Sequence, residues 1–336
     1  GYEQYAVETL ARMKQMGVVP EETDLAPINT MVDATNADGV PWPATDHVLP
    51  WDGLDDDHKK MFTRMAEVFA GFESYTDHEI GRFLDFLEDI GEFDNTIFVV
   101  TSDNGASGEG SPEGSVNENL FFNGIPDTIE NNLKYLDVLG GIETYNHYPT
   151  GWAQAFCTPY KMYKRYVWNG GICDPLVISW PAKIKAGGEL RHQYHHVSDI
   201  APTIYEMLGI EFPDTVKNYP QMPLDGVSMA YTFDKPGAKT AKKTQFYGLL
   251  GTRAMYKDGW KANTVHPATG GWDDFDNDKW ELHHVDLDRS EMHDLSDEHP
   301  DKLKELINLW FYQAALYDGL PIDDRAPYEM VGGSVK

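Results

Sequence analysis

The tetrapeptide Ser102-Asp103-Asn104-Gly105 has the clearest capacity for chemistry in this sequence. It directly follows the apolar run 96–101, which has the composition of a buried strand. Asp103 supplies a carboxylate and Asn104 an amide oxygen, and both are hard donors that suit Ca²⁺ or Mg²⁺ better than zinc. Because ligands of open α/β sheets bind outside the carboxyl ends of strands, this position predicts a cation site. The alternative is an ordinary tight turn, which Asp, Asn and Gly also favour.

A second candidate is His147, which ends the Gly-, Asn- and Ser-rich stretch 105–149 that follows the tetrapeptide. This stretch is typical of a loop-rich excursion that leaves the carboxyl end of a strand. His147 therefore has two interpretations. It is either a substrate contact that lies over the pocket, or a histidine that is exposed or bonded for structural reasons.

The elements around these residues predict an α/β fold. Apolar residues at helical spacing between 55 and 90 indicate one long helix or two nearly continuous helices. The runs 96–101 and 175–180 are apolar on both faces, as expected for strands that helices cover in a parallel sheet. A further helix is expected at 198–208. A helix followed by a buried strand is half of a βαβ alternation.

The chain has a different pattern from about residue 240 onward. Short alternating runs, separated by Asp-Gly and Gly-Gly turns, predict an antiparallel sheet with strands at 245–249, 253–256, 260–264 and 280–285. An amphipathic helix is expected at 301–317. We therefore predict two units, a larger α/β unit at 1–240 and a smaller unit at 241–336 that contains the antiparallel sheet plus the helix.

The composition excludes several classes of function. The 336 residues include 27 Lys and Arg against 55 Asp and Glu, and the net charge of −28 argues against a nucleic-acid surface. No stretch approaches the ~20 apolar residues that span a bilayer, so membrane insertion is not expected. Cys157 and Cys173 are too few for a disulfide framework or an all-cysteine zinc site. The first residue, Gly1, predicts a processed chain or a part of a longer protein, and neither the compartment nor the oligomeric state is indicated.

Several motifs taken together resemble the sulfatase family, with bacterial arylsulfatases as the most similar members. The order and spacing of the motifs carry the likeness, which extends over nearly the whole chain. The motifs are Phe98 to Gly110 (FVVTSDNGASGEG), Thr158 to Lys164 (TPYKMYK), Asn169 to Pro175 (NGGICDP), Trp180-Pro181, Asp199 to Thr203 (DIAPT) and Trp280 to Asp301.

The resemblance implies an alkaline-phosphatase-like fold, with a mixed or mostly parallel sheet flanked by helices. It also implies that Asp103 and Asn104 hold a divalent cation, usually calcium, and that Lys164 contacts the sulfate group. These roles agree with the chemistry, because a cation and an ammonium group stabilise the negative charge that shifts between oxygen atoms during sulfuryl transfer. The alternative for Lys164 is an exposed lysine between Tyr163 and Arg165.

The sequence departs from the family pattern at the nucleophile. The family uses a formylglycine, made from the Cys or Ser of a C/S-x-P-x-R motif that precedes SDNG. The similar run Cys157 to Lys161 follows SDNG and ends in Lys, so a buried, unmodified thiol is the simpler interpretation of Cys157. The paired aspartates, upstream lysine and histidines of the family site are also unmatched. The resemblance therefore predicts the carboxyl-terminal part of an arylsulfatase, which is inactive alone because its formylglycine belongs to a missing N-terminal portion.

The favoured function is the hydrolysis of a small-molecule sulfate ester with a divalent cation, Ca²⁺ or Mg²⁺, and the formylglycine nucleophile. One alternative is the hydrolysis of phosphate or phosphonate esters by a relative with the same metal scaffold. Another is a non-catalytic cation-binding fragment. Matched aryl sulfate and aryl phosphate substrates would separate the two enzymes, and a nucleophile motif encoded upstream of Gly1 would argue against the fragment.

Overall fold

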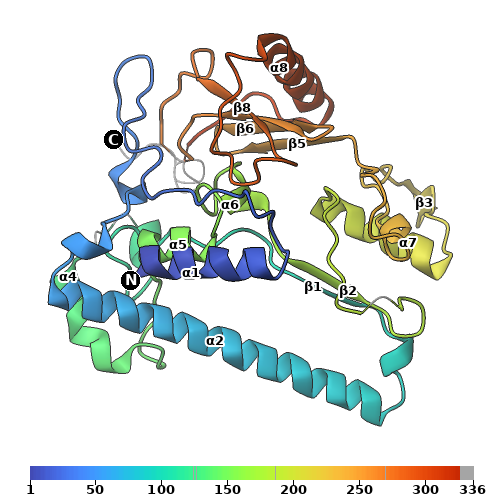
Figure 1. Ribbon diagram of the computed structural model, residues 1–336, viewed down its shortest axis with the longest axis horizontal. Coiled ribbons are helices and arrows are strands. Elements are labelled where there is room, and N and C mark those ends of the chain that lie inside the picture. Colours follow the sequence, from blue (N-terminus) through green and yellow to red (C-terminus); the bar gives the residue numbers. More distant parts are fainter. Residues whose placement is uncertain (124, 126, 186, 269, 326–336) are drawn as a thin grey trace.

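The structure, a computed structural model, describes residues 1–325 apart from 124, 126, 186 and 269. Near the N-terminus, helix α1 (Tyr2–Gln15) packs against α5 (Thr150–Phe156). The long helix α2 (Asp56–Asp89) runs along one edge of the molecule (Figure 1). None of the described helices is long and apolar enough to cross a membrane.

The predicted long helix is confirmed as one continuous helix, α2. Asp55 begins it, because its side chain accepts a hydrogen bond from the backbone N–H of His58. Met61, Phe62 and Met65, in the first half of α2, are fully buried in the larger hydrophobic core. This core also contains aromatic side chains from the N-terminal loops, α5 and the segment before α6, namely Trp42, Trp152, Tyr163, Tyr166 and Trp168.

The two predicted buried strands are present and adjacent, but they run in opposite directions. Strand β1 (Phe98–Thr101) pairs with β2 (Leu176–Ser179), with Phe98 opposite Ser179 and Thr101 opposite Leu176. Every pair of named strands in the described chain is antiparallel, so the predicted parallel sheet is not confirmed. The reason is that an apolar run specifies burial and not strand direction. These strands are also partly exposed instead of being covered on both faces.

Short elements occupy the stretch between β1 and β2. Helices α3 (Asn119–Phe122) and α4 (Ile129–Asn132) and the 3₁₀ segment η4 (Leu133–Val138) lie in the loop-rich excursion, and α6 (Asn169–Ile172) precedes β2. After β2 come η5 (Val197–Asp199), α7 (Ile200–Leu208), the short pair β3 (Thr215–Val216) and β4 (Tyr219–Pro220), and η6 (Ala230–Thr232). The remaining 3₁₀ segments are η1 (Ala44–Asp46), η2 (Trp51–Gly53) and η3 (Phe93–Asn95).

The predicted C-terminal antiparallel sheet and helix are confirmed. Strands β5 (Thr244–Leu249), β6 (Thr252–Lys257), β7 (Trp260–Thr264) and β8 (Trp280–His284) form a sheet in that order. Helix α8 (Pro300–Leu316) packs on this sheet, and Leu306, Trp310 and Ala314 enter the second core. The molecule is thus an α/β protein with antiparallel sheets, and the unit boundary at residue 240 stays a prediction.

Candidate active site

The SDNG motif leaves the end of β1 and turns against the Gly-Gly pair of α6. The backbone N–H of Gly105 donates a hydrogen bond to the carbonyl of Gly171 at 3.1 Å. A Cβ atom added at Gly105 would lie 1.8 Å from the carbonyl oxygen of Gly170, so a larger residue cannot make this approach. Two motifs that are far apart in the sequence are therefore in direct backbone contact.

Lys164 lies beside the same loop. Its backbone N–H donates to the carbonyl of Ala106 at 3.0 Å, two residues after Asn104. Its Nζ lies 3.3 Å from Oε2 of Glu109, and 36% of its side chain is exposed. Lys164 is thus anchored at its backbone and tethered at its ammonium group, while solvent still reaches the side chain.

His147 reaches this cluster from the other end of the excursion. Its Nε2 lies 4.0 Å from Oε2 of Glu109, and its Nδ1 is 3.0 Å from the carbonyl oxygen of Tyr148, to which it donates. The ring is buried, and burial lowers the pKa of His147. The structure therefore brings His147 and Lys164 to one carboxylate. The role of His147, either as a substrate contact or as a structurally bonded histidine, stays a prediction.

That carboxylate, Glu109, is the site residue that sequence reasoning missed. Its side chain is only 6% exposed, and Nε of Arg165 lies 3.5 Å from Oε1. With Lys164 and His147, three basic side chains therefore surround it. The available signal in the sequence was a charged residue between two glycines, Gly108 and Gly110, a few residues after SDNG. A Cβ at Gly108 would lie 2.3 Å from the ring of Tyr163, and one at Gly110 would lie 2.0 Å from the carbonyl oxygen of Tyr148.

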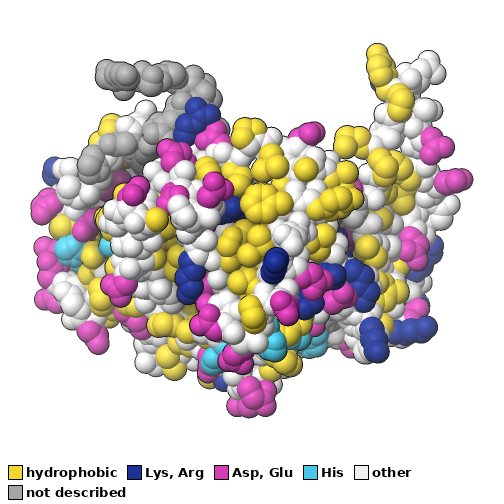
Figure 2. All heavy atoms as spheres, turned by 90° about the horizontal axis from the view of Figure 1, so that it is seen from above, with side chains coloured by type: hydrophobic (Ala, Val, Ile, Leu, Met, Phe, Trp, Pro, Cys, Tyr) yellow, Lys and Arg dark blue, Asp and Glu magenta, His cyan; other side chains and the backbone are white. Residues whose placement is uncertain are grey.

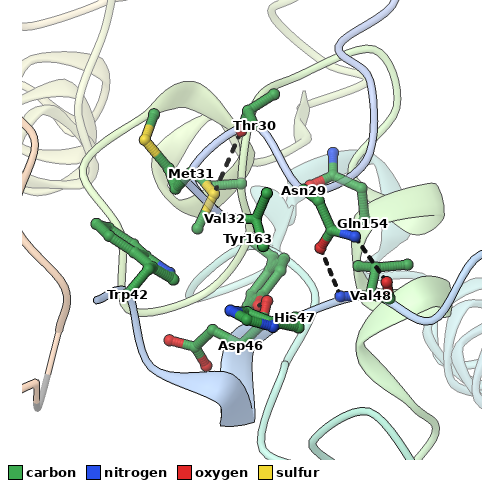
Figure 3. A pocket seen from close by; sticks show the side chains of 11 residues that line it. Asn29, Thr30, Met31, Val32, Trp42, Asp46, His47, Val48, Gln154 and Tyr163 are labelled. Carbon is green, nitrogen blue, oxygen red and sulfur yellow. Dashed lines mark hydrogen bonds between the residues drawn. The ribbon is translucent and has the colours of Figure 1, made fainter. Parts of the chain in front are cut away.

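The long N-terminal loop supports this cluster through Asp46. Its carboxylate pairs with Arg165 at 2.8 Å and with the hydroxyl of Tyr166, and Tyr163 donates to its backbone carbonyl. Figure 3 shows Asp46 and His47 on the wall of a neighbouring pocket. The pocket encloses about 10 Å³, which is about the room that one water needs, so it cannot hold an ester substrate.

The predicted cation ligands lie at the open side of the site. Asp103 is exposed and Asn104 is half-buried. The carboxyl of Asp174 forms a hydrogen bond with Ser102 and senses the charge of Asp103. Burial raises the pKa of Asp174 to about 6, the hydrogen bond opposes this shift, and the charge of Asp103 adds to it. Their oxygen atoms fit a hard cation. However, no three His, Cys, Asp or Glu side chains of the described residues form a group that could hold a metal ion, so this set is incomplete.

Two other sequence features have structural roles here. Cys157 is buried behind the loop, its sulfur accepts from the N–H of Ala106 at 3.2 Å, and burial raises the pKa of its thiol to about 12. This protonated thiol agrees with the interpretation of Cys157 as unmodified. Asp199 of the DIAPT motif is fully buried, where it accepts from the backbone of His196 and from Nζ of Lys242 and so organises the start of α7.

Residues 21–210 match the Sulfatase family, and the chain therefore belongs to the sulfatase family. An uncharacterized sulfatase of Schizosaccharomyces pombe is 31% identical over 332 residues, which cover 96% of this chain and 54% of that protein. An arylsulfatase of Klebsiella aerogenes is 25% identical over 231 residues, 68% of this chain and 44% of that protein. The chain thus spans about half the length of these relatives.

A solved structure described as the crystal structure of Ps i-CgsB resembles this chain in fold. The TM-score is 0.50 at 17% identity, and the match covers 98% of this chain and 58% of that chain. The match with the Sulfatase family contains Asp103, Asn104, His147 and Lys164, as well as Glu109.

Proposed function

We propose that this chain carries part of the active site of a sulfate ester hydrolase of the arylsulfatase type. The observation that supports this proposal is the convergence of the SDNG loop, Lys164 and His147 on the buried carboxylate of Glu109. In a chain with a net charge of −28, an anionic substrate needs a local cluster of positive charge to bind. Membership of the sulfatase family supports the proposal that this anion is a sulfate ester.

Lys164 is the proposed sulfate contact. Its side chain is partly exposed, so the ammonium group can meet a ligand from solvent while Glu109 holds it from the buried side. Such a tether reduces the reorganisation needed when the ammonium group stabilises negative charge on sulfate oxygens. Arg165 is fixed by Asp46 and Glu109, so we assign it to support and not to substrate binding.

Asp103 and Asn104 are the proposed ligands of Ca²⁺ or Mg²⁺, with the carboxylate of Asp174 beside them. When bound, such a cation would polarise the sulfate oxygens and offset their charge. The formylglycine nucleophile, which the family resemblance implies, is proposed to belong to the part of a sulfatase that this chain does not span.

The cation is tested in the longer protein, because the ligands found on this chain form an incomplete set. Calorimetric titration of that protein with CaCl₂ is expected to show binding that Asp103→Ala abolishes and that Asp77→Ala, at an exposed position on α2, leaves unchanged. Equal calcium affinity in both variants would refute the cation site.

Turnover needs the rest of a sulfatase. In the longer protein, Lys164→Ala should lower the hydrolysis of 4-nitrophenyl sulfate by about 10²-fold or more, and the exposed Lys239→Ala should not. Faster hydrolysis of 4-nitrophenyl phosphate than of the sulfate would favour the alternative of a phosphate or phosphonate ester hydrolase. Calcium binding without turnover of either ester would favour the non-catalytic fragment.

A further inference from the structure

Glu291, in the loop after β8, is a buried carboxylate outside the cluster around Glu109. Acidic side chains are spread over the face of the molecule seen in Figure 2, whereas Glu291 is fully buried. Its backbone has a φ angle of 57°, in the left-handed region that residues with a Cβ rarely adopt. Such conformations persist only where the surrounding contacts fix them, and they cluster at functional sites.

Both carboxylate oxygens of Glu291 accept from nitrogen donors. Oε1 lies 2.9 Å from Nζ of Lys261 and accepts a hydrogen bond from Nδ2 of Asn263 at 2.6 Å, and both of these β7 residues are fully buried. Oε2 accepts from the backbone N–H of Asn169 at 2.5 Å. Nζ of Lys261 also donates to Oδ1 of Asn169 at 2.9 Å. Glu291 and Lys261 therefore fasten the first residue of α6 to the C-terminal sheet.

Helix α6 contacts both parts of the candidate active site through its two glycines. The carbonyl of Gly171 accepts the N–H of Gly105 in the SDNG motif. The N–H of Gly170 donates to the carbonyl of Lys161 at 3.0 Å, three residues before Lys164. A Cβ added at Gly170 would lie 2.5 Å from that carbonyl oxygen, so α6 packs on this segment in backbone contact. Helix α6 thus joins the SDNG loop to the segment that carries Lys164.

We propose that Glu291, together with Lys261, is a positioning residue for the SDNG loop and thereby for the proposed cation site. It holds the start of α6, and α6 in turn holds the loop that carries Asp103 and Asn104. Asp174 follows α6 by two residues, so the same anchor also sets the position of this carboxylate. Groups that orient the ligands of a metal control its affinity. The inference rests on the proposed function, because it explains how the proposed ligands are held together.

Glu291→Gln tests this role in the longer protein. An amide offers one acceptor oxygen where two are needed, so its NH₂ group faces an N–H donor of either Asn169 or Asn263. Calorimetric titration with CaCl₂ should show an affinity that is weaker by about tenfold or more. Without calcium, hydrogen exchange of the backbone amides in 103–106 should become about tenfold faster, because the loop loses its support.

Asp199→Asn is the matched control. Asp199 is likewise a fully buried carboxylate, 2.8 Å from Nζ of Lys242, but it lies at the start of α7 and not of α6. Both variants should lower the urea midpoint, while only Glu291→Gln should change the calcium affinity and the exchange of the loop. Equal changes in the two variants, or no change in Glu291→Gln, would overturn the proposal.

A double variant separates positioning from stability. Lys261→Met, added to Glu291→Gln, removes the buried charge that the single variant leaves unpaired, so the urea midpoint should recover while calcium binding stays weak. Recovery of both would overturn the proposal. If the unsubstituted protein binds no calcium but the exchange of the loop responds as expected, the proposed cation site fails and the role of Glu291 in holding the loop stands. If calcium binds and Glu291→Gln leaves its affinity unchanged, the positioning role is wrong and the cation site stands.

Discussion

The carboxylate of Glu281 on β8 connects the C-terminal sheet to the segment that carries Lys164. Nζ of Lys161 lies 2.9 Å from its Oε2, and Nε1 of Trp168 donates to the same oxygen at 3.2 Å. Nε2 of His283 lies 3.4 Å away. All four side chains are buried, so we predict that Glu281→Gln removes a large stabilising interaction between distant parts of the chain.

The magnitude follows from the protonation equilibrium of Glu281. Burial alone would raise its pKa, but hydrogen bonds and charges from His283 and Lys161 outweigh burial and lower the pKa to about 2. Against an ordinary value of 4.5, this difference corresponds to roughly 3 kcal/mol of the free energy of unfolding. Because Gln keeps the shape and can still accept a hydrogen bond, we expect a loss of about 2–3 kcal/mol.

The pH dependence has a definite sign. The contribution of Glu281 is fully present above about pH 4.5 and is lost as the pH falls toward 2. His283 behaves in the opposite sense. Burial disfavours its charge, yet hydrogen bonds with Asp288 and Glu281 raise its pKa to about 9, so its contribution is present below pH 6.5 and is lost as the pH rises toward 9. The effect of Glu281→Gln should therefore be largest between about pH 4.5 and 6.5.

The assay is urea unfolding of the chain and the variant from pH 3 to 9, followed by tryptophan fluorescence. Glu298→Gln, at an exposed position just before α8, is the matched control and should change stability by less than about 0.5 kcal/mol. An equal effect of the two substitutions, or an effect of Glu281→Gln that does not change with pH, would refute the reasoning.

Three further substitutions test other parts of the structure. Gly170→Ala places a Cβ 1.9 Å from a backbone carbonyl and should destabilise the fold by about 3 kcal/mol or more in thermal unfolding, whereas Gly237→Ala meets no atom within 4 Å and should be tolerated. Asp199→Asn should cost roughly 2 kcal/mol near pH 6, because the pKa of Asp199 is lowered to about 2, and this loss should fade as the pH drops from about 4 to 2 in denaturant titrations. Glu109→Gln should lower the urea midpoint by the equivalent of about 1–3 kcal/mol, since buried Arg165 loses the carboxylate of Glu109. An unchanged midpoint would contradict the role of Glu109 as a buried anchor.

Local sequence patterns were sufficient to predict the C-terminal sheet. The strands lie within one or two residues of the predicted runs because alternation and tight turns are short-range signals. Each strand pairs with its neighbour in sequence, so no long-range information was needed to place them. The sulfatase family could likewise be predicted from the order of the motifs, and the family match confirms it.

The arrangement of the site depends on contacts between distant segments, which no local pattern in the sequence predicts. The side chains around the buried Glu109, which are Lys164, Arg165 and His147, come from segments that follow it in the chain. Asp46 supports Arg165 from a loop that precedes it. Between two glycines in an irregular loop, Glu109 has no periodicity that would predict its burial. The roles of Asp103, Asn104, Lys164 and His147 stay predictions, although their positions beside one loop agree with a shared site.

The strands β1 and β2 show most clearly what an apolar pattern encodes. Both runs predict cover on two faces, yet Val100 and Val177 remain about half exposed. The second half of α2 shows the same mismatch, because Phe72 and Phe83 are more than half exposed although an amphipathic helix of this length is expected to bury its apolar face. A hydrophobic pattern indicates which face of a segment can be buried, and it does not specify which other segment covers that face. The exposed apolar surface of α2, β1 and β2 therefore could not be predicted from the pattern, although these elements lead into the SDNG site.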